Sequence, residues 1–138
     1  MNLKFFYWYF KSVLSPQFCD EIVRYGKEQT LKLATTGKQV RSLIKHGKLT
    51  KKETEKLKKT RNSNVVFFSD PWIYDKITPL LRDANVSAGW NFKIESAEAF
   101  QFTRYKKNQF YTWHQDSWGE PYNNPKNPRF HNKIRKLS

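Results

Sequence analysis

The first thirty residues combine one aromatic run with one amphipathic helix. The six consecutive aromatic residues from Phe5 to Phe10 predict a buried strand, because large aromatic side chains favour burial. Ser15 is a good N-cap, and Pro16 suits the first helical position, where its missing N–H costs nothing. The apolar residues of this helix have helical spacing and are expected to form the core stripe: Phe18, Cys19, Ile22 and Val23.

The segment from about 40 to 61 differs from its surroundings, because it is rich in lysine and poor in apolar residues. Thr50 and Glu53 have the spacing of a capping box, which predicts a short helix over 51–59 with Leu57 as its apolar anchor. Two interpretations are open: a solvated insertion that opens easily, or an anion-binding surface. Its eight basic residues after position 44 are Lys45, Lys48, Lys51, Lys52, Lys56, Lys58, Lys59 and Arg61.

An apolar pattern returns after this basic segment. Residues 64–68 (NVVFF) predict a strand, and Asp70 followed by Pro71 repeats the signal of a helix start. Pro79 cannot continue that helix without a kink, so we predict a second short turn that begins at Thr78.

From Trp90 onward the apolar period changes to two, which is typical of β-strands. We predict strands over 97–105 and 109–115, joined by a turn in which Asn108 takes a left-handed backbone. The second strand is then expected to return beside the first as a hairpin.

Length and composition place these elements in one domain. The chain has 138 residues, which is enough for one domain and too few for two. We expect an α+β fold, with a helical region over 1–89 and the first core strands over 90–138. No apolar run approaches the roughly 20 residues of a transmembrane helix, and the single cysteine favours a reducing, cytoplasmic location.

The formal net charge of +14 raises the question of a polyanionic partner. Lysines that neutralise phosphates, together with aromatic side chains that stack on bases, would make a single-stranded nucleic-acid-binding module. The aromatic residues alternate as core residues do, which argues against nucleic acid as the main partner. Such a module is the alternative to an enzyme.

The most informative segment is 105–116, YKKNQFYTWHQD. Side chains two residues apart on a strand point the same way, so His114 and Asp116 are expected to face one side together. An imidazole nitrogen and a carboxylate oxygen placed in this way can occupy two adjacent corners of one metal. A third ligand from a distant strand would complete the 2-His-1-carboxylate face of non-haem Fe(II) oxygenases.

Several motifs in order along the chain resemble the 2-oxoglutarate/Fe(II)-dependent dioxygenases of the prolyl 4-hydroxylase type. They are Leu14-Ser15-Pro16, Arg61-Asn62-Ser63, Trp72-Ile73-Tyr74, Ala84-Asn85, Tyr105, Phe110-Tyr111, Trp113-His114-x-Asp116 and Arg135-Lys136-Leu137-Ser138. The resemblance implies a double-stranded β-helix, or jelly roll, with N-terminal helices packed on its first strands. It also implies Fe(II) bound by His114 and Asp116, and 2-oxoglutarate as cosubstrate held by Tyr105.

One departure from the family pattern changes the expected activity. The family has a distal iron-binding His, and a distal Arg or Lys for 2-oxoglutarate, several strands after His-x-Asp. We do not accept His131, Arg129 or Arg135 for these roles, because they lie too close to Asp116 in sequence. The chain therefore resembles the N-terminal half of a dioxygenase, and we expect no turnover without a C-terminal half, which could be separately encoded. The substrate, whether peptide, nucleotide or small molecule, is left open.

Overall fold

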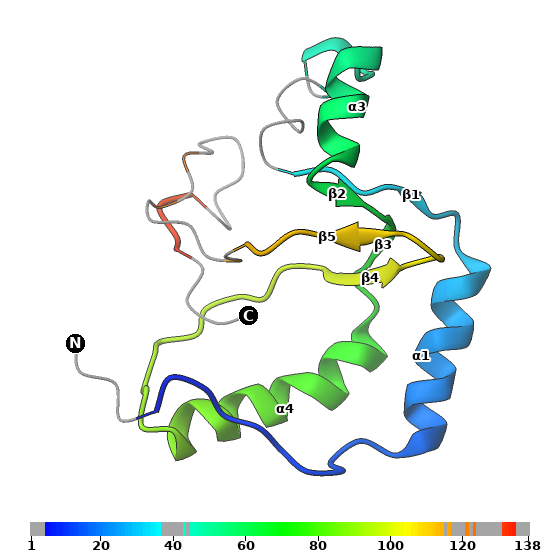
Figure 1. Cartoon of the computed structure of the whole chain (residues 1–138). Helices are drawn as coiled ribbons and strands as arrows, with labels where there is room; N and C mark the ends of the chain where they lie inside the picture. The colour runs from blue at the N-terminus through cyan, green and yellow to red at the C-terminus, as the bar shows by residue number, and fades with distance from the viewer. Residues whose placement is uncertain are drawn as a thin grey trace. The chain divides into compact units, whose positions relative to one another are not determined.

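The computed structural model contains helices and short antiparallel sheets, which confirms the predicted α+β class (Figure 1). It describes residues 5–36, 43, 45–114, 116, 121, 123 and 131–134. The chain divides into two compact units. We call Lys11–Ser69 with Ala99–Thr112 the sheet unit, and Met1–Phe10, Asp70–Glu98 and Trp113–Ser138 the helix unit.

Helix α1 (Pro16–Glu28) begins where the sequence predicts, because the Phe18 N–H donates to Ser15 Oγ at 3.2 Å. It packs on the sheet through its last turns. The Tyr25 ring lies 4.9 Å from that of Phe68, and Phe68 stacks on Phe102 at 5.9 Å between ring centroids. Gly26 is buried directly against the Phe102 ring. This aromatic cluster is the core that joins α1 to the sheet.

The predicted inner face of α1 is partly wrong. Cys19 and Val23 are exposed, whereas Ile22 is half-buried. The face toward the sheet is rotated to the stripe Phe18, Ile22, Tyr25 and Gly26. The physical reason is Gly26, since only a residue without a side chain lets the Phe102 ring approach the helix this closely.

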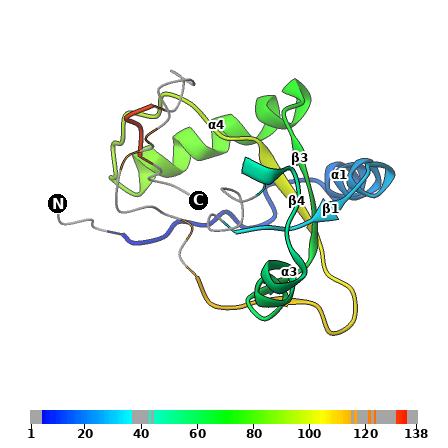
Figure 2. The ribbon, with the colours of Figure 1, turned by 90° about the horizontal axis from the view of Figure 1, so that it is seen from above.

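Two small sheets form in the sheet unit. The first has the order β1-β3-β4 and contains β1 (Lys32–Leu33), β3 (Asn64–Phe68) and β4 (Phe100–Arg104) (Figure 2). The second pairs β2 (Arg61–Asn62) with β5 (Phe110–Tyr111). All pairings are antiparallel, with Asn64 opposite Arg104 and Phe68 opposite Phe100. Both sheets are open, so the closed jelly roll stays a prediction.

The predicted hairpin is wrong in its pairing and right in its turn. Asn108 has the expected positive φ of 63°, and the Gln109 N–H closes the turn on the Lys106 carbonyl at 3.0 Å. The strand after the turn pairs with β2 instead of β4, and it ends at Tyr111 instead of 115. Gln109 explains this choice, because its side chain accepts from the Lys106 N–H and donates to Asn62 Oδ1 on β2.

The basic segment forms helix α3 (Lys51–Lys58), and the predicted capping box is confirmed. The Thr50 N–H donates to Glu53 Oε2 at 2.9 Å, and the Glu53 N–H donates to Thr50 Oγ1 at 3.3 Å. Leu57 is fully buried, while the lysines of the helix are exposed. A solvated helix held by one apolar anchor is therefore confirmed; positions 40–42 and 44 lie outside the described residues.

In the helix unit, α4 (Pro71–Ser87) starts after Asp70 as predicted and continues through Pro79. The predicted second start at Thr78 is wrong. Proline already has a helical φ, and the one backbone bond that it removes belongs to the carbonyl of Asp75, an exposed residue. Solvent can satisfy that carbonyl, so the helix tolerates the proline.

Asn85 fixes the chain reversal after α4. Its buried side chain donates to the Phe92 carbonyl at 2.9 Å and accepts from the Phe92 N–H at 3.0 Å. Its backbone carbonyl accepts from the N–H groups of Trp90 and Asn91. The turn uses positive φ at Gly89 and Asn91, which both residue types tolerate.

The aromatic run 5–10 is not a buried strand. Every residue of the run is exposed, and no strand is assigned there. The Phe5 carbonyl accepts from the Trp90 indole N–H at 2.6 Å, and the Phe5 and Trp8 rings meet edge to face. Six consecutive aromatic residues lack the alternation that would give a strand one buried face, which explains why the prediction of a strand over 5–10 is wrong.

Within the part of the chain that the structure describes, no helix combines the length and the apolar character needed to cross a membrane.

Substitution of Gly26 tests the contact on which the α1 packing depends. A Cβ at this position would lie 2.7 Å from Phe102 ring atoms, so we expect Gly26→Ala to destabilise the fold by about 1–3 kcal/mol in urea unfolding. The matched control is Glu21→Ala, which places alanine at an exposed position of the same helix and should change stability by less than about 0.5 kcal/mol. Equal stability of Gly26→Ala and the wild type would contradict this packing.

Candidate metal site

The segment that carries His114 leaves the end of β5. The Thr112 N–H donates to the Thr60 carbonyl at 2.9 Å, which extends the β2–β5 pairing by one bond. Residues 113, 114 and 116 come next and have no strand structure. The predicted reason for the His114 and Asp116 juxtaposition, shared strand parity, is therefore wrong, although the two side chains do meet.

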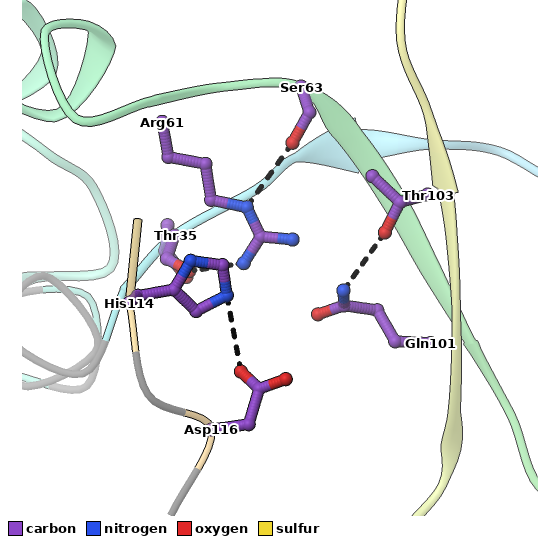
Figure 3. Close-up of polar contacts among 7 residues, drawn as sticks. All are labelled: Thr35, Arg61, Ser63, Gln101, Thr103, His114 and Asp116. Atoms are coloured by element: carbon purple, nitrogen blue, oxygen red, sulfur yellow. Dashed lines mark hydrogen bonds and ion pairs between the residues drawn. The ribbon is translucent and has the colours of Figure 1, made fainter. Parts of the chain in front are cut away.

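His114 Nε2 and Asp116 Oδ1 lie 3.2 Å apart (Figure 3). As a hydrogen bond, this is an N–H···O contact in which the imidazole donates to the carboxylate. Metal bonds of about 2.1 Å place adjacent ligand atoms about 3.0 Å apart at 90° and about 3.4 Å apart at a tetrahedral angle. The observed separation falls between these values, so the distance between the two atoms is compatible with two neighbouring corners of one metal ion.

Both side chains of the pair are open to solvent, with exposed fractions of 35% for His114 and 57% for Asp116. An exposed contact of this kind contributes about 0–1 kcal/mol to stability. Removal of either side chain is therefore expected to leave the fold intact, which makes the pair suitable for mutagenesis.

Within the part of the chain that the structure describes, no third ligand lies close to the pair, since no three His, Cys, Asp or Glu side chains there lie close enough together to hold a metal ion. His131, which lies too near Asp116 in sequence to match the family's distal histidine, is half-buried and is not part of such a group. Arg129 and Arg135 lie outside the described residues.

Tyr105 lies just after β4, in the sheet unit, and is exposed. His114 and Asp116 belong to the helix unit. That Tyr105 lines the same pocket as the pair and binds 2-oxoglutarate thus stays a prediction.

Sequence reasoning missed the environment of Arg61. The sequence places this residue in the basic run, yet it is 5% exposed and lies over the Tyr111 ring at 4.4 Å. Its Nε donates to Ser63 Oγ and its Nη1 donates to the Thr35 carbonyl, both at 3.2 Å (Figure 3). A usable signal is that Arg61-Asn62-Ser63 follows the predicted helix and precedes the predicted strand 64–68; in the structure Arg61 begins β2 and does not lie on the solvated helix.

Sequence reasoning also missed an ion-pair cluster in the helix unit. Glu95 pairs with Lys133 and, at 3.5 Å, with Lys93. The hydrogen bond and charge of Lys133 lower the pKa of Glu95, desolvation opposes them, and Lys93 adds a smaller lowering contribution. This contact ties residue 133 to the segment after α4.

Comparison of the chain with protein-family models, with curated proteins and with solved structures finds no significant match to any of the three.

The Glu95 cluster predicts a pH-dependent contact. Because the folded pKa is depressed, the stabilisation is present above the unfolded pKa of the carboxyl and is lost as pH falls through the lower folded value. Carboxyl-detected NMR should give a Glu95 pKa below that of an unperturbed glutamate, returning toward the ordinary value in Lys133→Gln and in high salt. Lys76→Gln, on the exposed surface of α4, is the control. A Glu95 pKa that does not respond to Lys133→Gln would contradict the ion pair.

Proposed function

We propose that this chain carries the His-x-Asp part of an Fe(II)/2-oxoglutarate-dependent dioxygenase. The observation that carries the proposal is the 3.2 Å approach of His114 Nε2 to Asp116 Oδ1. The motifs from Leu14 to Asp116 that resemble the prolyl 4-hydroxylase type give the same assignment from sequence. The third iron ligand and the cation for 2-oxoglutarate would come from outside the described residues.

The roles of the chain's own residues depend on their chemistry. His114 would present a deprotonated Nε2, and Asp116 a carboxylate oxygen, as two ligands on one side of the metal. Tyr105 would donate its hydroxyl hydrogen to a carboxylate of 2-oxoglutarate. The bound iron would supply oxygen activation, which couples decarboxylation of 2-oxoglutarate to substrate hydroxylation. A reducing cytoplasmic location is part of this proposal.

Metal binding by the pair has a characteristic pH dependence. The Nε2–H proton that points to Asp116 in the hydrogen bond must leave before Nε2 can bind a metal, so affinity falls as His114 becomes protonated. An ordinary His–Asp hydrogen bond would respond in the opposite sense, since it strengthens when the imidazole is charged. The two explanations of the contact are therefore separable by experiment.

Calorimetric titration with Fe(II) under anaerobic conditions, or with Mn(II), tests the proposal. We expect weak binding by the wild-type chain that increases from about pH 6 to about pH 8 and is lost in His114→Ala and Asp116→Ala. The controls are His46→Ala and Asp83→Ala, which remove the same groups from exposed positions elsewhere. With an added C-terminal segment that supplies the missing groups, His114→Ala should also abolish succinate formation from 2-oxoglutarate. Undiminished metal binding by both site variants would refute the assignment.

A second candidate function is supported by the exposure of the aromatic run. Aromatic residues elsewhere in the chain alternate as core residues do, which argues against nucleic acid. In the run 5–10, however, Phe6 is 88% exposed and Tyr7 and Tyr9 are each 75% exposed. Exposed lysines on α3 supply the positive charge that phosphates attract. We propose single-stranded nucleic-acid binding as the alternative activity.

Fluorescence anisotropy with a labelled single-stranded oligonucleotide checks this alternative. We expect affinity to fall steeply with salt, and the triple variant Lys51→Gln/Lys52→Gln/Lys56→Gln to reduce the salt slope by roughly two to three. Phe6→Ser/Tyr9→Ser should weaken binding by about 10-fold or more, through lost stacking. Glu55→Gln is the matched α3 control. Salt-independent or undetectable binding would exclude the alternative and leave the metal assignment unaffected.

A further inference from the structure

Arg61 is a buried cation for which the described part of the chain offers no carboxylate partner. It is 5% exposed, and no Asp or Glu among the described residues forms an ion pair with it. A guanidinium keeps its charge in proteins, and burying an uncompensated charge is costly. An anion is the natural compensating group.

The geometry around Arg61 holds the guanidinium in one orientation. Ser63 Oγ accepts from Nε, the Thr35 carbonyl accepts from Nη1, and the Tyr111 ring lies against the guanidinium face at 4.4 Å. These three contacts come from three separate parts of the sheet unit. A guanidinium fixed in this way loses little conformational freedom when it binds a further group.

The remaining nitrogen, Nη2, is buried and makes no hydrogen bond within the described residues. In Figure 3 it points away from Ser63 and Thr35, toward the side on which Gln101 and Thr103 lie. An unmade hydrogen bond from a buried charged donor is unusual and costly in a folded protein. Thr35 and Tyr111, which contact the guanidinium, are themselves only half-buried, so the guanidinium lies close to the surface of the sheet unit.

We propose that Arg61 is the anchor of an oxyanion-binding site in the sheet unit, with a carboxylate or phosphate oxygen as the acceptor for Nη2. A carboxylate is planar and a phosphate is tetrahedral, and both present pairs of oxygens that a guanidinium recognises. The site is independent of the proposed iron ligands, since it rests only on Arg61 and its neighbours within the sheet unit. It also differs from the α3 lysine surface, because those lysines are exposed and Arg61 is not.

The test monitors the Arg61 Nε–H signal in ¹⁵N-resolved NMR of the full chain at constant ionic strength. Inorganic phosphate and sodium acetate are titrated separately against sodium chloride. We expect a saturable shift of the Arg61 signal with at least one oxyanion and none with chloride. The anion that saturates the shift at the lower concentration identifies phosphate or carboxylate as the ligand class. The exposed Arg24 on α1 should show no saturable shift and serves as the internal control.

Thermal unfolding provides a second readout. The oxyanion that shifts Arg61 should raise Tm saturably in the wild type and in Arg24→Gln. Arg61→Lys keeps the charge but loses the forked geometry, and it should weaken binding by about 10- to 100-fold. If Arg61→Lys does not fold, the wild-type NMR titration still decides. Equal responses to phosphate, acetate and chloride, or an unchanged affinity in Arg61→Lys, would mean that Arg61 is not an anion site.

Discussion

The sheet unit depends on the way Ser63 joins two sheets. The continuous segment from Arg61 to Phe68 pairs with β5 before Ser63 and with β4 after it. Ser63 is fully buried, its carbonyl accepts from the Ala34 N–H at 2.9 Å, and its hydroxyl accepts from Arg61 Nε. The Ser63 carbonyl thus keeps a backbone hydrogen bond where the ladder changes partner, its hydroxyl bonds the Arg61 side chain, and its full burial leaves no room for a larger side chain.

This junction also determines where the chain leaves the sheet. Because β5 pairs with β2, the Thr112 N–H reaches the Thr60 carbonyl, and the polypeptide leaves the sheet two residues before His114. The metal-binding candidates therefore lie on irregular, exposed backbone. A two-ligand arrangement there supplies correct spacing but little affinity, since a facial triad needs a third protein group. The proposed dioxygenase role accordingly needs a contribution from beyond the described residues.

The sequence predicted best what local chemistry decides. The Ser15 cap, the Thr50–Glu53 capping box and the left-handed Asn108 each depend on side chains within four residues, and all three are present. The choice of β2 as the pairing partner of β5 was not predictable, because it depends on a hydrogen bond from Gln109 to Asn62, 47 residues away. Burial of the aromatic run was predicted from composition alone, which says how much surface could be buried but not whether a partner covers it.

The candidate site shows the same difference between what local sequence determines and what long-range contacts determine. The Cα atoms of residues two positions apart lie within about 7 Å in any backbone, so proximity of His114 and Asp116 was predictable. The strand parity offered as the reason for the side-chain contact was wrong. The contacts of the Arg61 guanidinium could not be predicted from sequence, since they include a residue 26 positions before it and a ring on β5. Long-range contacts of this kind carry the information that a local pattern lacks.

The central claim is that His114 and Asp116 bind one metal ion together. Paramagnetic broadening by substoichiometric Mn(II), measured residue by residue in NMR spectra of the chain, tests it most directly. The account predicts selective loss of the His114 imidazole and Asp116 carboxyl signals, with those of His46 and Asp83 unaffected. Broadening that centres on other side chains, or that spreads evenly over the acidic residues, would contradict it.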